Sequence, residues 1–519
     1  MMKVIGLFLT LLCLSEAYRI LVVFPVPSKS HSILGHGVVN HLLDAGHEVV
    51  HVTSYPHGKT VKNLKEVDLT SIADYFTALK DSTDEFKLKN RVGDRRGGTS
   101  ILIYYLMYEM NKKILTDPTL VKFLEDPKEK FDAVITEWFF YENVAGIASL
   151  FDCPLIWFAT TEASWNVVRL VDELPNPSYN VDIFSTSKPP LDFWERVQEL
   201  CTVVWRSLQL SVVFTPLEKS VYNSVFNEIA AKRGVTIPSY DQVVYNASFL
   251  FINSHPSFGG AYRLPQNAKY VGGFHVETKT KPLPKDLQTL MDGAKDGVIY
   301  FSMGSNLNSE DMSEHMITSI LKMFGKLKQT VLWKFQTQSD RVPSNVHLIK
   351  WAPQQSILAH PNLKMFITHG GQLSTIEAIH HGVPVVGIPV IADQHVNMAS
   401  VVDKGFGIVV DLGEDMADDM EVAIKKILGD NSYALKAKEL SQLYHDRRNP
   451  GEEMVYWIEH VIRTKGALHL RSPALSLPFY KRFYLDLVVL IFVLIGSIIA
   501  IQKLINKFKS KKQIKTKKN

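Results

Sequence analysis

The sequence predicts an α/β protein of two facing domains, each on a largely parallel sheet, with one transmembrane helix near the C-terminus. The chain has 519 residues, which is enough for two domains that each bury a core. Short apolar runs alternate with helical patterns in both halves, and this alternation is typical of parallel sheets. Residues 483–502 form one apolar stretch of about the 20 residues that cross a bilayer.

The first 17 residues are typical of a secretory signal. They combine Lys3, an apolar run over residues 4–14 and small residues at Ser15 and Ala17, three and one positions before a cut. We therefore expect residues 1–17 to be removed, so that the mature chain begins at Tyr18. The protein is then expected to enter the secretory pathway.

The first domain is expected over residues 18–276. The run YRILVVF is β-rich and is followed by turn residues, then by a helical pattern over 33–45 that Gly46 closes, then by a second strand over 48–53. This order predicts a βαβ unit. Further patterns of strand, helix and strand follow at 133–135, 144–150 and 155–158.

A linker is expected at residues 277–286, ETKTKPLPKD, because charges and two prolines interrupt the pattern there. The second domain is expected over residues 287–448. Its predicted strands are 298–302, 331–335, 347–350, 365–368 and 385–388. Residues 449–482 are expected to hold a C-terminal helix and a juxtamembrane segment. That helix should begin after a capping Asn449, with Pro450 first, and run to about Thr464.

The predicted transmembrane helix, 483–502, is followed by a basic tail over 503–519 that carries eight lysines. Such clusters mark the cytosolic side of a span, so both domains are expected in the lumen. Lys515 and Lys517 resemble a dilysine retrieval signal, which favours a single-pass type I protein of the endoplasmic reticulum membrane over a plasma-membrane address. The alternative is a lysine run that only binds anionic lipid.

Composition excludes a nucleic-acid binder, because 57 basic residues nearly balance 53 acidic ones and the excess lies in the tail. Cys153 and Cys201 remain in the mature chain and either pair or are simply small buried residues. Asn246 lies in the sequon Asn246-Ala247-Ser248 and is a glycosylation candidate. Two strongly apolar stretches, 101–105 and 203–214, are interpreted as core elements; the alternative is contact with the bilayer.

The stretch FITHGGQLSTIEAIHHGVPVVGIPVIADQ, residues 366–394, predicts a ligand site. A strand runs into His369-Gly370-Gly371, and a helix follows from Ser374. A glycine loop before a helix N-terminus aims backbone N–H groups at one point, where an anion binds. Glu377, one turn inside the helix, would accept hydrogen bonds from the hydroxyls of a ribose. Phosphate and ribose together indicate a nucleotide.

Three other strand ends fit this interpretation. Trp351 and Gln354, in WAPQ, offer an aromatic face and polar atoms for a base. Ser305, in FSMGS, lies in a turn that could contact phosphate. Asp393 and Gln394 end a later strand, where their side chains could bind the hydroxyls of a sugar.

Together these motifs, with Gly382-Val383-Pro384 and Pro389, resemble the donor-binding signature of the UDP-glycosyltransferases. The resemblance covers nearly the whole chain, since residues 457–471, the span and the basic tail are similar to the membrane-bound animal members. It implies the GT-B fold of two Rossmann-like domains and lumenal transfer of sugar from a UDP-sugar to small lipophilic acceptors, in conjugation or detoxification.

The resemblance also implies roles for individual residues. Trp351 would stack on uracil, and Gln354 would contact its edge or the ribose. Glu377 would hold the ribose. Ser305 and His369 would bind the diphosphate together with Gly371, and Asp393 and Gln394 would bind the sugar. Family members commonly carry asparagine where this chain has Leu373, so Ser374 or backbone amides would have to replace one phosphate contact.

A sugar transferred with inversion needs a base for the acceptor hydroxyl, and histidine suits that pH range. His31 matches the family's catalytic histidine by its place after the first strand, whereas His36 lies about a turn and a half further on. A carboxylate should orient the base. The family pattern places an aspartate after a strand like FDAVIT, where this chain has Glu137; Asp132 opens that strand and is expected to lie too far away.

No metal or other cofactor is expected, and the UDP-sugar would be a co-substrate. His36, His41, His47 and His51 have spacings that span loop, helix and strand, and no Asp-x-Asp triplet is present to hold a metal-bridged diphosphate.

Two other functions fit part of the pattern. A nicotinamide oxidoreductase is disfavoured because residues 35–40 only half match GxGxxG. A catalytically weak UDP-sugar-binding or lipophile-binding carrier is suggested by Leu373 and Glu137, but His31 and Asp393 argue against it. UDP-glucose is the preferred donor, with glucuronate and galactose open. The sequence leaves the acceptor and the oligomeric state, including a homo-oligomer, undetermined.

Overall fold

The computed structural model describes residues 17–82, 87–93, 101–260, 262–277, 280–305, 307, 309–336 and 342–516. Residues 1–16 of the predicted signal, part of the predicted linker and Lys517 of the dilysine pair therefore lie outside the described residues. The chain divides into two compact units, one up to Arg471 and one from Ser472.

The first unit contains two parallel sheets. In its N-terminal half the described strands follow the order β3-β2-β1-β4-β5-β6-β7, and every pairing is parallel. The strands are β1 (Arg19–Phe24), β2 (Glu48–Thr53), β3 (Leu64–Asp68), β4 (Ala133–Trp138), β5 (Leu155–Ala159), β6 (Phe249–Ile252) and β7 (Ala268–Tyr270). The order reverses between β1 and β4, so the loops after these two strands leave the same edge side by side.

The second sheet repeats this plan in the C-terminal half. Its described order is β10-β9-β8-β11-β12-β13, again parallel throughout. The strands are β8 (Val298–Ser302), β9 (Thr330–Lys334), β10 (Val346–Ile349), β11 (Leu363–Thr368), β12 (Val385–Gly387) and β13 (Gly407–Val409). Here the reversal lies between β8 and β11. The strands predicted in this half are confirmed within about one or two residues at their ends.

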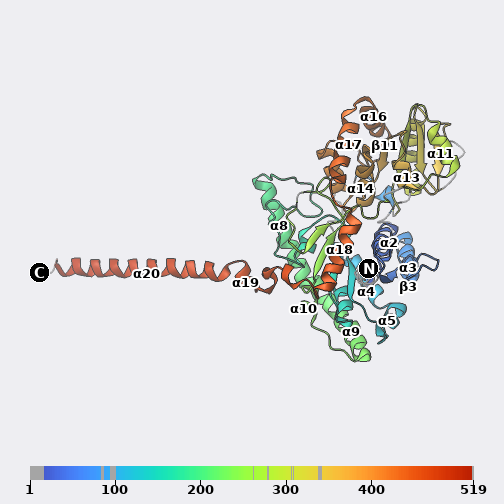
Figure 1. Ribbon diagram of the computed structural model, residues 1–519. Coiled ribbons are helices and arrows are strands. Elements are labelled where there is room, and N and C mark those ends of the chain that lie inside the picture. The colour runs from blue at the N-terminus through green and yellow to red at the C-terminus, as the bar shows by residue number, and fades with distance from the viewer. Residues whose placement is uncertain are drawn as a thin grey trace, which may run out of the picture. The chain divides into compact units, whose positions relative to one another are not determined.

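Helices cover both faces of each sheet (Figure 1). Those of the N-terminal half are α2 (Lys29–Asp44), α3 (Thr70–Ser82), α4 (Ile101–Leu115), α5 (Pro118–Glu125), α6 (Gly146–Leu150), α7 (Trp165–Val168), α8 (Phe193–Gln209), α9 (Thr215–Arg233) and α10 (Tyr240–Val244). Those of the C-terminal half are α11 (Lys285–Asp292), α12 (Glu314–Phe324), α13 (Gln354–Leu358), α14 (Gln372–His381), α15 (Gln394–Asp403), α16 (Met416–Gly429) and α17 (Ser432–His445).

Strand side chains alternate between two cores. In β1, Leu21 and Val23 face one apolar cluster, whereas Ile20 and Val22 face another. In β8, Ile299 and Phe301 are separated from Val298 and Tyr300 in the same way. Since successive side chains of a strand point to opposite faces, a sheet buried on both faces reads as a continuous apolar run.

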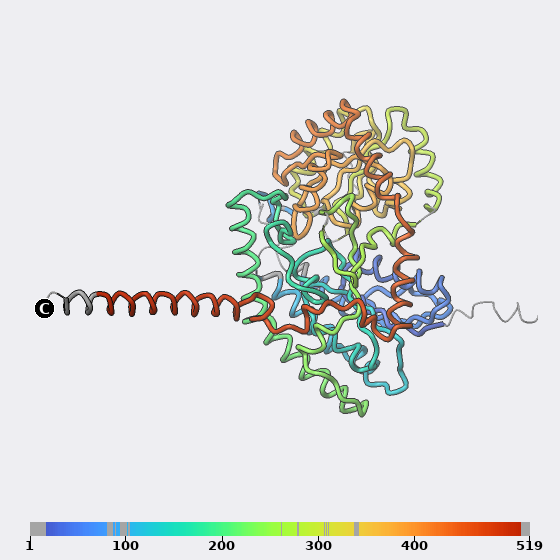
Figure 2. Tube along the Cα trace, turned by 60° about the vertical axis from the view of Figure 1, so that its left-hand side comes forward, coloured from blue at the N-terminus to red at the C-terminus, as the bar shows by residue number. Residues whose placement is uncertain are grey.

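Helix α18 (Pro450–Arg463) returns the chain to the N-terminal half. Its predicted start is confirmed, because the Asn449 side chain accepts hydrogen bonds from the backbone N–H groups of Gly451 and Glu452 at 2.8 and 3.2 Å. Met454 and Ile458 pack into the core that contains β1. Figure 2 shows this orange-red helix leaving the C-terminal half and lying along the other. The two halves are thereby packed together.

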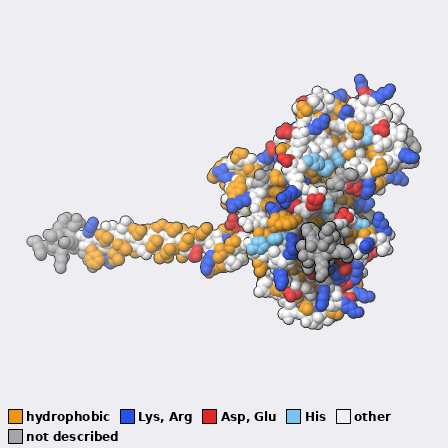
Figure 3. All heavy atoms as spheres, viewed as in Figure 1, with side chains coloured by type: hydrophobic (Ala, Val, Ile, Leu, Met, Phe, Trp, Pro, Cys, Tyr) orange, Lys and Arg blue, Asp and Glu red, His pale blue; other side chains and the backbone are white. Residues whose placement is uncertain are grey.

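One predicted core element is largely exposed. The apolar stretch 203–214 continues from α8 through a π-helical segment, Leu210–Phe214, into α9. Val203 and Phe214 are buried, but the other face is open, and Figure 3 shows hydrophobic side chains gathered over α8. The exposed residues of this face include Trp194, Leu200, Val204, Trp205, Leu208 and Val212. The core interpretation is therefore wrong for this face, because helical periodicity separates the apolar residues into two groups.

The stretch 101–105 is divided similarly. Ile101 and Tyr105 are exposed, whereas Tyr104 is buried against Phe140 and Phe214. Only part of this stretch therefore belongs to the core.

The second unit contains α19 (Phe479–Arg482) and α20 (Leu485–Thr516). In the described chain, two helical stretches are long and apolar enough to cross a membrane, judged by length and composition: Phe193–Arg233 and Leu485–Lys509. The second begins two residues after the predicted start of the span. Its apolar side chains are exposed along the helix (Figure 3).

Cys153 and Cys201 are both free thiols in the structure. Burial raises the pKa of the partly buried Cys153 to about 12, while Cys201 lies exposed on α8. Asn246 is exposed, and its side-chain oxygen accepts a hydrogen bond from Arg471 Nη1 at 2.6 Å.

Candidate active site

The predicted site residues follow the carboxyl ends of strands. Within the C-terminal half, Ser305 follows β8, Trp351 follows β10 and His369 follows β11. Because all these strands are parallel, their carboxyl ends lie at one edge of the sheet. Ser305 and His369 flank the reversal in strand order, which is where open α/β sheets bind ligands.

His31 and Glu137 form a pair at the equivalent edge of the first sheet. His31 lies in the first turn of α2, after β1, and Glu137 is the penultimate residue of β4. His31 Nδ1 contacts Glu137 Oε1. The Glu137 side chain is fully buried, whereas that of His31 retains 13% exposure. The carboxylate therefore holds Nδ1 of the ring, so that Nε2 is the nitrogen that could exchange a proton with a substrate.

Phe139 holds the same ring from another side, with its centroid 4.5 Å from that of His31 in an edge-on arrangement. The longer side chain of Glu137, compared with the aspartate of the family pattern, thus does not prevent contact with the histidine. Asp132 lies at the opposite end of β4, where its carboxylate accepts a hydrogen bond from the Arg19 backbone N–H. It is remote from His31, as predicted.

His36 does not share this environment. It lies five residues further along α2, and its ring packs against His57 and His51, with centroids 4.0 and 5.4 Å away. Of the two candidate bases, only His31 contacts Glu137 in the described structure.

His369 occupies a narrow slot between β8 and α14. A Cβ atom added to Gly304 would lie 2.5 Å from His369 Cε1, and one added to Gly371 would lie 2.6 Å from its Nε2. Gly304 also has a φ of +81°, which other residues adopt only with strain. The glycines on both sides are therefore required for the ring to fit.

Burial lowers the pKa of His369 to about 4, and the neighbouring Lys334 adds to the decrease. The imidazole is therefore neutral near pH 7 and can donate one hydrogen bond. Lys334, the last residue of β9, donates from Nζ to the Gly304 carbonyl at 2.7 Å. Lys334 was missed by sequence reasoning, although its place at the carboxyl end of a parallel strand was a usable signal.

Gln354 and Glu377 belong to one hydrogen-bond network. Gln354 Nε2 donates to Glu377 Oε2 at 2.5 Å and to Ser374 Oγ at 3.1 Å. Gln355 Nε2 donates to Glu377 Oε1 at 3.1 Å. Burial raises the pKa of Glu377, and the bonds from Gln354 and Gln355 oppose that shift. The carboxylate is thus held in a fixed orientation. Gln355 was not predicted.

Trp351 is 64% exposed, which is unusual for so large a side chain. Two lysines lie over its ring, Lys29 from α2 and Lys334 from β9, each with Nζ 5.5 Å from the centroid. Lys29 belongs to the N-terminal half, so this contact joins the two halves. It was not predicted, because sequence alone does not show which loop of one half meets the other.

Asp393 and Gln394 begin α15. Gln394 Oε1 accepts the backbone N–H groups of Val390 and Ile391 at 2.9 and 3.0 Å, so this buried side chain holds the preceding loop. Asp393 Oδ2 accepts from Asn397 Nδ2 at 2.8 Å. Burial raises the pKa of Asp393, while Asn397 and the charge of His31 lower it. Asp393 is therefore close enough to His31 to interact electrostatically across the two halves.

The first turn of α14 is fixed to the N-terminal half. Gln372 Nε2 donates to the Asn253 carbonyl at 3.0 Å. Leu373 packs against the apolar core around β1. Leu373, which replaces the asparagine of the family pattern, therefore makes an apolar contact between the halves. The hydroxyl next to it along the chain is that of Ser374, whose Oγ accepts a hydrogen bond from Gln354.

The chain is similar to known proteins over nearly its whole length. Residues 19–519 match the family model described as UDP-glucoronosyl and UDP-glucosyl transferase. UDP-glucosyltransferase 2 of Dactylopius coccus is 31% identical over 99% of both chains. Human UDP-glucuronosyltransferase 3A2 is 30% identical over 93% of this chain and 92% of that protein.

Solved structures support the fold. The glycotransferase of kitacinnamycin superposes with a TM-score of 0.55 at 17% identity, over 86% of this chain and 100% of the other. The calicheamicin glycosyltransferase CalG4 gives 0.53 at 18% identity, over 86% and 99%. The predicted GT-B fold is thereby confirmed. With a family model matched from β1 to the C-terminus, this chain belongs to the UDP-glucuronosyl and UDP-glucosyl transferases, enzymes that transfer sugar from a UDP-sugar.

Proposed function

We propose that this enzyme transfers a hexose, preferentially glucose from UDP-glucose, to a hydroxyl of a small lipophilic acceptor, with inversion to a β-glycoside. The observation that carries this proposal is the His31–Glu137 pair, placed at the carboxyl edge of its sheet and within electrostatic reach of Asp393. A base in the acceptor half and a polar group in the donor half is the arrangement that direct displacement at a sugar carbon requires.

His31 would act as the general base. Its Nδ1 is engaged by Glu137, so Nε2 would take the proton of the acceptor hydroxyl as its oxygen attacks the anomeric carbon. The bond from that carbon to the β-phosphate oxygen breaks, and UDP leaves. The imidazolium formed in this step is stabilised by the Glu137 carboxylate.

The C-terminal half would bind the donor. Trp351 offers an exposed aromatic face for uracil, and Gln354 and Glu377 present oriented polar atoms for its edge and the ribose. Ser305, Gly371, Ser374 and the neutral His369 would contact the diphosphate, and Asp393 with Gln394 would position the sugar. Lys334, which lies beside His369, would add a positive charge for the leaving group.

The transfer is tested by mixing the full-length protein with a panel of UDP-sugars and mixed phenols and identifying products by mass spectrometry. UDP-glucose should give the highest kcat/KM. The coupling constant of the anomeric proton by NMR should identify the β-glycoside, whereas an α-product would exclude a single inverting displacement. We further propose that no added metal ion is needed, so rates with and without Mg²⁺ should agree.

We propose that the N-terminal domain spans residues 18–276 and the donor domain 287–448, both in the lumen of the endoplasmic reticulum, with residues 483–502 in the membrane. The exposed Asn246 supports a lumenal glycan, since its side chain reaches the surface. Protease treatment of sealed microsomes should remove only the basic tail. An Asn246→Gln chain should lose the mobility shift caused by endoglycosidase, and cleavage of both domains from the outside would reject this topology.

A further inference from the structure

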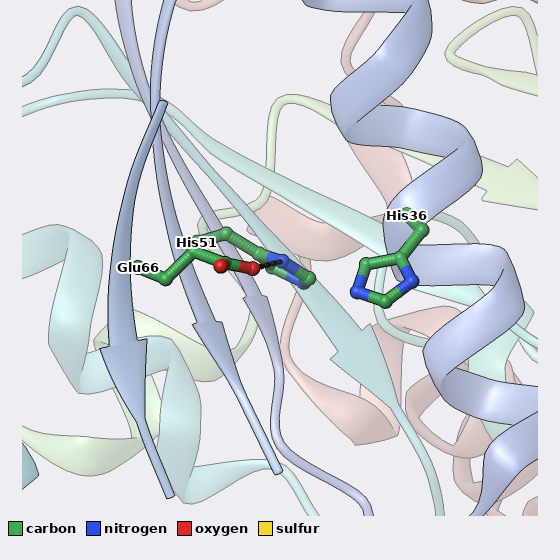
Figure 4. A group of neighbouring side chains, drawn as sticks. All are labelled: His36, His51 and Glu66. Atoms are coloured by element: carbon green, nitrogen blue, oxygen red, sulfur yellow. Dashed lines mark ion pairs between the residues drawn. The ribbon is translucent and has the colours of Figure 1, made fainter. Parts of the chain in front are cut away.

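Three elements of the N-terminal half bring two histidines and a glutamate together outside the proposed transfer site. His36 comes from α2, His51 from β2 and Glu66 from β3. Figure 4 shows the His36 and His51 rings directed toward the space between α2 and the sheet, with Glu66 beside His51. One ligand atom from each residue lies within 4.8 Å of the others.

The cluster contains buried nitrogen atoms without partners. His51 is 0% exposed, and neither of its ring nitrogens has a hydrogen-bond partner among the described residues. Its Nδ1 lies 3.8 Å from Glu66 Oε1, which is beyond hydrogen-bond distance. His36 Nε2 is likewise buried without a partner. Buried polar atoms are normally satisfied, so a group that satisfies several of them at once is expected here.

A second layer of contacts orients the carboxylate. His57 Nδ1 lies 2.9 Å from Glu66 Oε1, and the His57 backbone N–H donates to Glu66 Oε2 at 3.0 Å. A Cβ atom added to Gly35 would lie 3.0 Å from His51 Nε2, so the glycine permits the close approach of α2 to His51. Such outer contacts are typical of metal sites, where they fix the ligand geometry.

We propose that His36, His51 and Glu66 bind a divalent transition-metal ion of the zinc type, which joins α2 to β2 and β3. A tetrahedral zinc ion with ligands about 2.0–2.1 Å away places them roughly 3.3–3.4 Å apart. The 3.8 Å between His51 and Glu66 is already close to this value. Movement of the His36 ring would close the remaining separation, and water would complete the coordination.

The donor set selects the class of metal. Mg²⁺ and Ca²⁺ prefer oxygen ligands, whereas imidazole nitrogens with one carboxylate suit Zn²⁺. His36, His41, His47 and His51 are separated along the chain by five, six and four residues, a spacing that spans several elements. The fold unites His36 and His51 and leaves the other two elsewhere: His41 bonds the Phe274 carbonyl, and His47 lies 3.2 Å from Glu459.

The site is tested by metal content. Full-length protein in detergent is incubated with ZnSO₄, passed through a desalting column and analysed by mass spectrometry for zinc and protein. The wild type should retain about one zinc per chain. His36→Gln and Glu66→Gln should retain roughly a tenth of that or less. The control variant is His315→Gln, which alters an exposed histidine on the other half, 3.4 Å from Asp415. It should retain as much zinc as the wild type.

Two further measurements on the wild type do not depend on the variants folding. Co²⁺ should give visible absorption bands typical of tetrahedral coordination by nitrogen and oxygen. Zinc at about 100-fold excess over its Kd should raise the Tm of the wild type by roughly 2–4 °C. Failure of the wild type to retain zinc, or zinc retained equally by both cluster variants, would overturn the proposal. Neither outcome bears on the transfer reaction, since none of these residues contacts His31 or the donor loops in the described contacts.

Discussion

His31 and His369 follow the first strand of one sheet and a central strand of the other, yet their surroundings differ. His31 has a buried carboxylate on one ring nitrogen and remains partly open. His369 is enclosed by glycines and lies near Lys334, and burial lowers its pKa to about 4. A carboxylate stabilises a protonated ring, whereas burial beside a cation opposes protonation.

In the proposed mechanism, one residue type serves two purposes within a single site. A histidine paired with Glu137 can accept a proton during the reaction. One kept neutral among glycines can donate a hydrogen bond to an anion throughout the cycle. The first should therefore determine kcat, and the second should determine donor affinity. The predictions below separate these effects, beginning with the largest.

Replacing His31 with alanine should have the largest effect. Loss of a general base lowers kcat by roughly 10²- to 10⁴-fold, while the KM for the UDP-sugar should change little because the donor is bound by the other half. Initial rates of UDP release over a range of donor concentrations measure both values. A control chain with His315→Ala should be unaffected, and a His31→Ala enzyme with unchanged kcat would remove the base assignment.

Replacing Glu137 with glutamine should have the next largest effect. The amide keeps the volume but removes the negative charge that stabilises the imidazolium, so kcat should fall by about 10²-fold or more. Glu137→Asp is the informative companion, because the shorter chain restores the charge but withdraws it from His31. If Glu137→Asp were as active as the wild type, contact distance would not matter and the role of this pair would need revision.

Acid should destabilise the protein through His369. Its pKa is about 4 in the folded chain and 6.5 in the reference state, so the unfolded chain binds the extra proton first. Stability from this group is therefore complete above pH 6.5 and is lost as the pH falls toward 4, by up to about 3 kcal/mol. Tryptophan-monitored urea unfolding at pH 7 and pH 4.5 should show a smaller loss for His369→Gln than for the wild type. Equal losses would place this histidine in a more open environment.

Replacing His369 with alanine should weaken donor binding. One hydrogen bond to a charged diphosphate oxygen contributes about 1.5–3 kcal/mol, so the KM for the UDP-sugar should rise by roughly 10- to 100-fold, with a smaller change in kcat. Titration calorimetry with UDP gives the affinity directly. A variant that lost kcat but kept UDP affinity would place His369 in the chemical step.

The smallest effect is expected at Leu373. Asparagine at this position restores the family residue but removes an apolar side chain from the contact between the two halves. The free energy of unfolding should fall by about 1 kcal/mol, while UDP affinity should change by less than about threefold. A large gain in UDP affinity would instead show that the asparagine reaches the diphosphate.

Much of the proposed donor site could be assembled from the sequence because its residues lie in order along the chain. Trp351, His369, Glu377 and Asp393 each follow or begin an element whose pattern is plain in sequence. Parallel pairing then places them at one edge automatically. The sequence did not indicate Lys29, Lys334 or Gln355. Lysine and glutamine are common near the ends of elements, and only the spatial contacts of these three residues connect them with the proposed site.

Sequence alone determined the alternating strands and helices, the apolar C-terminal stretch and the family. These follow from local periodicity and from motifs, which act over short spans of chain. Tertiary structure decided which distant residues lie together: His31 with Glu137, and His36 with His51 and Glu66. It also decided that one face of α8 stays uncovered. Spacing along the chain does not determine these contacts or this exposed face, because separation in space depends on how the sheets and helices pack.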